Sequence, residues 1–371
     1  MNLFYLFSYI IIFSALIALT LSYFKIPLLI SYILTGILIS NLSTIFTKEI
    51  SILGELGLIF LLFLVGLRLD LKRFSEFSKE IIYLGIGQIF FTTILGTILG
   101  ILLGINLIHA FMIGIAFSFS STIIVTKILL DKNDLDTLYG RLSLGMLLIQ
   151  DLFAILILLI IGVFSINKIT ILEISDLISI IFIFTGLYFL GKLISKFFLK
   201  IKNNSELIFL LSLAWLMIFI IIAKYKNFSI EAAAILAGIS LSGSNVLAEI
   251  TRKFSPIKDL FLIFFFVYLG SQINLNYATV FSSLVYTLFI LIFNPLIVFY
   301  ILNFLNYPRR VAFEVGLTTA QISEFSFILI QTFSKQYTAL TGFVGILTFL
   351  FSSFMLYNNS KIYNLIKNLL E

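Results

Sequence analysis

Residues 140–164 read GRLSLGMLLIQDLFAILILLIIGVF, an apolar run that is interrupted in its middle by a glutamine and an aspartate. The run is long enough to cross a bilayer as a helix, which needs about 20 apolar residues. At about 1.5 Å per residue, Asp151 lies about 15 Å along the helix from Arg141, close to the middle of the membrane. An ionisable group at that depth costs roughly 2.5–3.5 kcal/mol on insertion scales, so it marks a functional site by default.

The whole chain shares the apolar character of this run. Of its 371 residues, 61% are apolar and 11% are charged, and the mean hydropathy is +1.16. Soluble domains are about 45–50% apolar and about 25% charged, so the composition excludes a soluble enzyme, a disordered chain and a nucleic-acid-binding protein. The chain has no cysteine and a single histidine, His109, which excludes thiol chemistry and a histidine metal cluster. We therefore expect that the protein is not an enzyme, and that it binds neither a cofactor nor a nucleic acid.

Apolar runs of spanning length recur along the chain and predict an all-α polytopic membrane protein. The thirteen candidate spans are 3–23, 26–42, 50–69, 80–104, 107–130, 138–165, 175–199, 206–223, 230–242, 257–271, 280–305, 310–334 and 339–357. The first run lacks a basic region and a small-residue cleavage site, which predicts a spanning helix and not a signal peptide. Residues 1–371 are predicted to form a single transmembrane transporter domain with no soluble regulatory domain.

The lysine and arginine residues predict the orientation of these spans. With an odd number of spans, the two termini lie on opposite sides of the membrane. If the N-terminus is outside, 17 cationic residues fall on the inner side and five on the outer side. The outer five are Lys48, Lys168, Lys224, Lys226 and Lys335. This bias follows the positive-inside rule and accounts for the net charge of +6. It predicts a cell-membrane protein with its N-terminus outside and its C-terminus in the cytoplasm.

Two of the candidate spans, 107–130 and 310–334, contain clusters of polar residues. Residues 114–122 read GIAFSFSST, and residues 316–324 read GLTTAQISE. Hydroxyl and amide groups satisfy backbone groups where a helix unwinds, and broken helices form ion sites in secondary transporters. A face of small residues for helix packing explains the first cluster equally well.

The positions of the two clusters also indicate an internal repeat. They fall in the fifth and twelfth spans, which run in opposite directions across the membrane. This placement predicts an inverted repeat of residues 1–165 and 206–360, with residues 166–205 as a linker helix.

Asp151, with the amide of Gln150 beside it, suits a site that holds either a proton or a small cation. Removal from water favours the protonated carboxyl group, whereas a bound cation favours the carboxylate. A site that cannot hold both at once makes an exchanger. The alternative is a structural carboxylate that is hydrogen-bonded to a neighbouring helix.

At these motifs the chain resembles the monovalent cation:proton antiporter-2 family, which includes the membrane part of Kef-type potassium efflux systems. The resemblance is collinear over nearly the whole chain. It is carried by GELGLIFLLFLVGLRLD at 54–70, FSSTIIV at 119–125, LIQDLFAI at 148–155, AAAILAGISL at 232–241, PIKDLFLIFFFVYLG at 256–270 and AQISEFSFI at 320–328.

The resemblance implies a sodium/proton antiporter-like fold, in which a dimerisation scaffold and a mobile core give elevator-type alternating access. In it, Asp151 takes the place of the aspartate that binds Na⁺ or K⁺ and the proton in turn, with Gln150 beside it. Ser121 and Thr122 match the first broken helix and are expected to bind the ion or the proton together with Asp151 and Gln150. The supporting polar residues of the core are Ser120, Gln321, Ser323, Glu324 and Asn294.

One of these positions departs from the family pattern. In many relatives a lysine lies near the ion site, and Asn294 stands at that position here, followed by Pro295. With one carboxylate and no lysine, we expect an electroneutral exchange of one cation for one proton.

A Kef-like potassium efflux pore is the alternative function, and it predicts conductance without obligatory proton counterflow. The sequence has no repeated carbonyl-filter motif of the kind potassium pores use, which favours the antiporter. Kef-type proteins carry a nucleotide- and thiol-responsive domain after the membrane region, so gating of that kind here would require a separate cytoplasmic regulatory subunit. The expected partners are membrane lipid, a second copy in a homodimer and that subunit.

Overall fold

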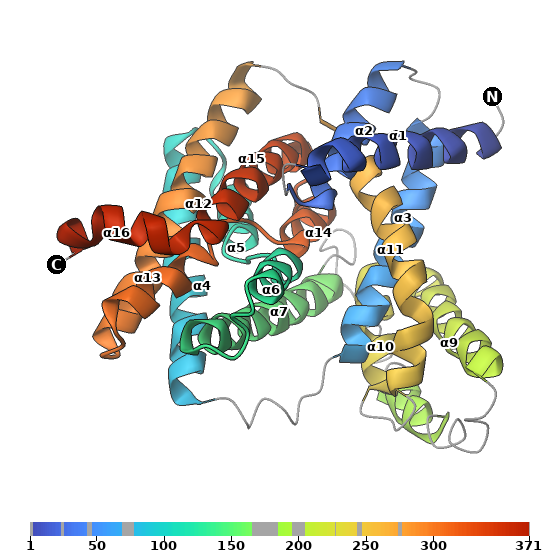
Figure 1. Cartoon of the computed structure of the whole chain (residues 1–371). Coiled ribbons are helices and arrows are strands. Elements are labelled where there is room, and N and C mark those ends of the chain that lie inside the picture. The colour runs from blue at the N-terminus through green and yellow to red at the C-terminus, as the bar shows by residue number, and fades with distance from the viewer. Residues whose placement is uncertain are drawn as a thin grey trace. The chain divides into compact units, whose positions relative to one another are not determined.

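The structure is a computed structural model that describes residues 3–23, 26–42, 47–68, 78–164, 185–194, 205–226, 228–242, 247–273 and 277–370 (Figure 1). The regular elements in these residues are helices. They are α1 (Leu3–Tyr23), α2 (Leu28–Leu42), α3 (Thr47–Arg68), α4 (Lys79–Leu102), α5 (Leu107–Ala116), α6 (Thr122–Asp131), α7 (Leu138–Phe164), α9 (Ser205–Tyr225), α10 (Ile230–Leu241), α11 (Leu247–Ser271), α12 (Tyr277–Phe304), α13 (Arg309–Leu317), α14 (Glu324–Phe333), the short 3-10 helix η3 (Lys335–Tyr337), α15 (Thr338–Tyr357) and α16 (Asn359–Leu370). Residues 185–194 are also helical.

Seven of the described helices are long and apolar enough to cross a membrane. They contain Phe4–Tyr23, Ile50–Leu67, Lys79–Leu102, Leu138–Ile160, Glu206–Tyr225, Thr279–Phe304 and Lys335–Tyr357. Shorter apolar helices lie between them. The predicted runs coincide with helices or helix pairs, except that the run at 175–199 falls partly outside the described residues. The described part of the chain therefore has the all-helical, polytopic architecture that the composition predicts.

The helices divide into two compact units. Unit 1 comprises Met1–Glu49, Phe77–Ala154 and Phe266–Glu371, and unit 2 comprises Ile50–Glu76 and Ile155–Phe265. All nine predicted site residues lie in unit 1.

Unit 2 is held together by close backbone contacts between α3 and α10. A Cβ atom at Gly66 would lie 2.2 Å from the carbonyl oxygen of Ile235, so only glycine permits this approach. Trp215 on α9 donates a hydrogen bond of 2.8 Å from Nε1 to the hydroxyl of Ser240 on α10. Small residues allow membrane helices to pack closely in this way.

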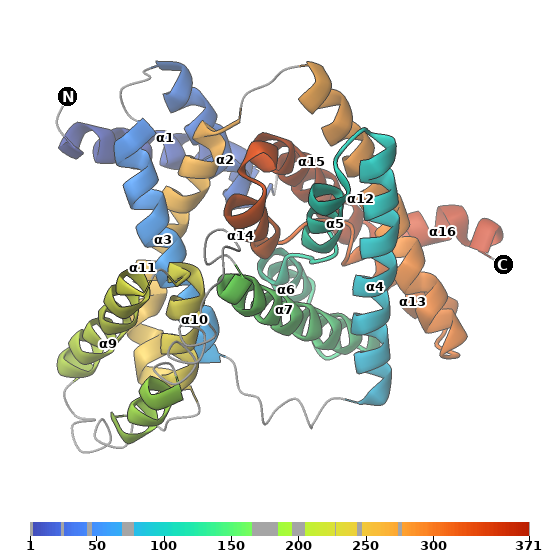
Figure 2. The ribbon, with the colours of Figure 1, turned by 180° about the vertical axis from the view of Figure 1, so that it is seen from behind.

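Unit 1 contains α4 and α12 side by side, as the views in Figures 1 and 2 agree. Tyr286 on α12 is fully buried and donates a hydrogen bond of 3.2 Å to the carbonyl oxygen of Gly96 on α4. On the neighbouring α5, a Cβ atom at Gly114 would lie 2.5 Å from the carbonyl oxygen of Thr93. These contacts hold α5 and α12 against α4, next to the first polar cluster.

The first polar cluster interrupts a helix, as one of the two predicted explanations requires. Residues 117–121 separate α5 from α6. Ser118 donates its hydroxyl to the carbonyl oxygen of Ile115 at 2.7 Å, and the hydroxyl of Ser121 accepts from the backbone N–H of Ile124 at 3.4 Å. The serines thus satisfy backbone groups that the missing helical turn leaves open.

The second polar cluster interrupts a helix in the same manner. Residues 318–323 separate α13 from α14. Thr318 and Thr319 donate their hydroxyls to the last carbonyl oxygens of α13, at 2.6 and 2.7 Å. Ser323 caps α14 by accepting from the N–H of Phe325 at 3.2 Å.

Two helices differ from the sequence prediction. α11 begins at Leu247 and continues through Pro256, whereas the predicted span begins at 257. Apolar content predicts where a helix lies in the membrane, but a helix can continue with polar residues beyond the apolar layer, as α11 does before Pro256. α16 follows the last predicted span and was not predicted.

Candidate functional site

Asp151 lies on α7 opposite the first residue of α6. Thr122 donates a hydrogen bond of 3.0 Å from Oγ1 to Oδ2 of Asp151, which is only partly buried. The N-terminus of a helix carries a partial positive charge that favours a carboxylate or another anion close to it. A hydroxyl donor and a helix N-terminus therefore both act on this carboxylate.

Gln150 fixes the unwound backbone beside Asp151. The backbone N–H of Ser120 donates to Oε1 of Gln150 at 2.9 Å, and Nε2 of Gln150 donates to Oε1 of Gln88 at 2.7 Å. All three residues are fully buried. Both ends of the Gln150 amide thus have protein partners, although a carbonyl oxygen keeps a second lone pair.

Gln88 on α4 is a member of the site that the sequence analysis missed. Its Nε2 donates to the carbonyl oxygen of Ser118 at 3.0 Å and to the hydroxyl of Thr92 at 3.1 Å. With the bond from Gln150, the Gln88 amide joins α4, α7 and the α5–α6 interruption. The available signal was a lone amide within the apolar segment GIGQIFF at 85–91.

Gln88→Leu is expected to lower the free energy of unfolding by about 2 kcal/mol, because it leaves buried partners unsatisfied. Thermal unfolding in detergent measures this effect. Phe90→Leu is the matched control, since Phe90 lies on the same helix with 57% of its surface exposed. Equal behaviour of the two variants would contradict the role of Gln88.

Asn294 on α12 bridges the two interruptions. Its Nδ2 donates to the carbonyl oxygens of Phe117 at 3.3 Å and Thr319 at 3.4 Å, and its Oδ1 accepts from the hydroxyl of Thr92 at 3.0 Å. The C-terminal ends of α5 and α13 carry partial negative charge, which the amide N–H groups complement. The neutral side chain of Asn294 therefore donates hydrogen bonds at the C-terminal ends of both α5 and α13.

Glu324 receives hydroxyl groups from both interruptions. Ser121 and Ser323 each donate to Oε2 of Glu324 at 3.4 Å. Glu324 is the first residue of α14 and is 6% exposed, so the positive end of α14 stabilises its carboxylate. The Glu324 carboxylate therefore joins Ser121, which caps α6, to Ser323, which caps α14.

Gln321 completes the connection between the two interruptions. Its Nε2 donates to the carbonyl oxygen of Ser121 at 3.4 Å, and its Oε1 accepts from the hydroxyl of Ser352 on α15 at 2.7 Å. The structure therefore places all nine predicted site residues in a polar network of unit 1 that consists of three hydrogen-bonded groups, which adjoin along the chain at Ser120, Ser121 and Thr122. Within the part of the chain that the structure describes, the buried hydroxyl of Ser120 has no hydrogen-bond partner.

The chemistry around Asp151 is that of oxygen atoms. Its carboxylate and the Thr122 hydroxyl are hard ligands, which suit alkali and similar cations better than soft metals. Among the described residues, no group of three or more His, Cys, Asp and Glu side chains is placed to hold a metal ion. Spanning helices, two interrupted helices and a carboxylate at one interruption define a membrane transport protein.

The chain belongs to the sodium/hydrogen exchanger family, whose transmembrane domain matches residues 9–356. This is a family of transporters and not of enzymes, and membership places the chain among cation/proton antiporters. It also makes the chain a multi-pass membrane protein, as the helices indicate.

The chain is also similar in sequence to individual transport proteins. The chain is 28% identical over 353 residues to the iron transporter MagA of Paramagnetospirillum magneticum, covering 91% of this chain and 81% of MagA. It is 25% identical over 342 residues to K⁺ efflux antiporter 5 of Arabidopsis thaliana, covering 88% of this chain and 60% of that protein. The chain spans about half the length of other K⁺ efflux antiporters that it matches. The predicted resemblance to Kef-type antiporters is confirmed.

The fold also matches a solved structure. The sodium proton antiporter MjNhaP1 from Methanocaldococcus jannaschii superimposes with a TM-score of 0.66 over 98% of each chain, at 17% sequence identity. The two proteins share an all-helical membrane fold.

Proposed function

We propose that the chain exchanges a monovalent cation, Na⁺ or K⁺, for a proton, and that Asp151 binds the two in turn. The observation that carries this proposal is the hydrogen bond of 3.0 Å from Thr122 to Asp151 at the start of α6, in a member of an exchanger family. A partly buried carboxylate at a helix N-terminus accepts a proton or a cation, and either one displaces the other.

Further ligands come from residues at the interruption between α5 and α6 and from α7. We assign the hydroxyls of Thr122 and Ser120 and the second lone pair of Gln150 Oε1 to the cation. The hydroxyls of Ser121 and Ser323 remain on Glu324, whose carboxylate balances the positive end of α14. Asp151 is then the group whose charge changes during the cycle.

The exchange is proposed to be electroneutral, with one cation for one proton. The support is Asn294, whose amide holds the carbonyl ends of both interruptions without a charge. A lysine at this position would add a titratable charge next to the site, and the amide adds none.

The remaining architectural features are part of the same proposal. They are thirteen spans, an inverted repeat with two crossing broken helices, a scaffold and a mobile core with elevator-type movement, a homodimer, and an N-terminus outside with a cytoplasmic C-terminus. A separate regulatory subunit remains an expectation. The names of the relatives widen the choice of ion, since MagA is called an iron transporter and the plant relative a K⁺ efflux antiporter.

The test is cation-driven proton movement in proteoliposomes that contain a pH-sensitive dye. Na⁺, K⁺ and Fe²⁺ are added in separate experiments, with and without a permeant anion that collapses the membrane potential. The proposal expects saturable proton movement with Na⁺ or K⁺ at a rate that the permeant anion does not change. A rate that depends on the potential contradicts electroneutrality. Cation flux without proton movement favours the efflux pore instead.

A further inference from the structure

The amphipathic helix α16 has a different character from the spanning helices. It reads NSKIYNLIKNLL over Asn359–Leu370, with apolar residues three and four positions apart and polar residues between them. It begins two residues after the end of α15, which is apolar enough to cross a membrane. The start of α16 is therefore at the level where the chain leaves the apolar layer.

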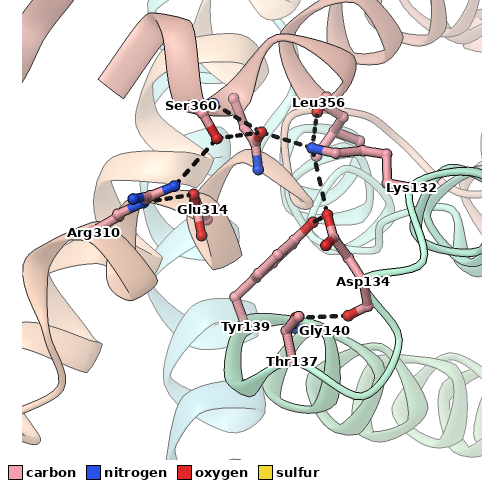
Figure 3. A network of polar contacts seen from close by, with 10 residues as sticks. Lys132, Asp134, Thr137, Tyr139, Gly140, Arg310, Glu314, Leu356 and Ser360 are labelled. Atoms are coloured by element: carbon pink, nitrogen blue, oxygen red, sulfur yellow. Dashed lines mark hydrogen bonds and ion pairs between the residues drawn. The ribbon is translucent and has the colours of Figure 1, made fainter. Parts of the chain in front are cut away.

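A network of polar side chains surrounds this starting point (Figure 3). Lys132, from the connection after α6, donates to Oδ1 of Asn359 at 2.7 Å and to the carbonyl oxygen of Leu356 at 3.1 Å, and forms an ion pair of 3.6 Å with Asp134. Such a concentration of charge belongs at the membrane–water boundary. The network ties the first residue of α16 to the end of α6.

A second contact ties α16 to the other interrupted helix. Arg310 on α13 donates to the hydroxyl of Ser360 at 3.3 Å and to Glu314 at 3.1 Å (Figure 3). Tyr363 packs on Phe313 of α13, with ring centroids 5.6 Å apart. One side of α16 is thus held by α13 and by the connection after α6.

The other side of α16 is uncovered and carries both apolar and cationic groups. Leu365 is 82% exposed, and Lys361, one turn before it on the same face, is exposed as well. Lys367 is also exposed, further along the helix on the face of Ser360 and Tyr363. Exposed basic side chains also lie on neighbouring elements of unit 1, at Lys127, Arg141, Arg309 and Arg310. A helix with exposed leucine beside lysines fits a bilayer surface with anionic headgroups, where leucine enters the acyl boundary and lysine meets phosphate.

We propose that α16 is a membrane-surface helix that docks the C-terminal end of α6 and the N-terminal half of α13 on anionic lipid. The lipid surface is the occupant because α16 starts where a spanning helix ends and its uncovered side combines an apolar residue with positive charge. Through Lys132 and Arg310, the docked helix restrains both interrupted helices from the same side. The inference is independent of the transported ion.

The chain lacks cysteine, so single-cysteine variants of the full protein test this proposal directly. Leu365→Cys and the exposed Asn364→Cys are labelled with an environment-sensitive fluorophore and reconstituted in phosphatidylcholine, with or without phosphatidylglycerol. With phosphatidylglycerol present, we expect a lipid-borne quencher to act several-fold more strongly at 365 than at 364, and aqueous iodide to show the opposite order. Equal quenching by iodide at both positions would overturn the proposal.

A charge variant tests the part played by anionic lipid. In the Leu365→Cys background, K361E/K367E is expected to lower the ratio of docked to undocked helix at least about fivefold in phosphatidylglycerol vesicles. Lys335→Glu, an exposed lysine before α15, is the control and should leave the ratio unchanged. Shielding of position 365 that is the same in phosphatidylcholine alone, or in detergent, indicates a zwitterionic surface or a second copy as the partner and overturns the proposal.

Discussion

Asp151→Asn is expected to reduce cation-driven proton exchange by at least about 100-fold. The amide keeps the size of the side chain but cannot lose or gain a proton at neutral pH, and it removes the charged ligand of the cation. Loss of a charged hydrogen-bonding group is worth about 3 kcal/mol, which corresponds to about 100-fold. Dye-loaded proteoliposomes with a cation pulse measure this change.

The control for Asp151→Asn is another carboxylate-to-amide substitution, at a position away from the site. Asp136→Asn, at an exposed position in the connection before α7, should leave exchange unchanged. Thr122→Val should slow exchange about tenfold because it removes one hydrogen bond from a hydroxyl to the Asp151 carboxylate, and Thr122→Ser should restore it. Exchange that persists in Asp151→Asn would exclude Asp151 as the carrier of the proton.

Asn294→Leu is expected to lower the free energy of unfolding by about 2–4 kcal/mol. The substitution leaves the carbonyl oxygens of Phe117 and Thr319 and the hydroxyl of Thr92 without this buried partner. Each unsatisfied buried group costs about 1–3 kcal/mol, partly offset by relaxation. The midpoint of thermal unfolding in detergent should fall accordingly.

A neighbouring position provides the comparison for Asn294. Phe293 is 48% exposed on the same helix, so Phe293→Leu should change the unfolding midpoint little. If Asn294→Leu is as stable as Phe293→Leu, the amide does not hold the two interruptions together.

The sequence predicted most of the helices, and offered an interruption as one of two explanations of the first polar cluster, because these features depend on local composition. Long apolar runs set the spans, and the serines and threonines near Ser121 and Thr319 are the groups that cap the ends of interrupted helices. Most of the predicted site residues were found because polar groups in an apolar run are few, whereas Asn294 was found only through the family resemblance. Their roles in transport stay predictions.

The pairing of these residues across helices could not be predicted from the sequence. Nothing local to Thr122 indicates that its hydroxyl meets Asp151, or that Ser121 meets Glu324. Gln88 was missed because a single amide in an apolar run gives a weak signal without its partners. α16 was not predicted because it is too short and too polar to span a membrane, although the spacing of its apolar residues, three and four positions apart, is present in the sequence.

The long reach of the network has a consequence for how the chain is made. Three of its bonds, from Asn294 to Phe117, from Ser121 to Glu324 and from Gln321 to Ser121, join residues that are 177, 203 and 200 positions apart. At about 5–20 residues per second, the ribosome needs roughly 10–40 seconds to supply the later partner after the earlier one. During that interval the residues of the first interruption can form their local capping hydrogen bonds, but the residues of the second half that they bind are not yet made. Biogenesis of this protein therefore includes a waiting period, in which the first half is inserted in the membrane before its polar centre can form these hydrogen bonds.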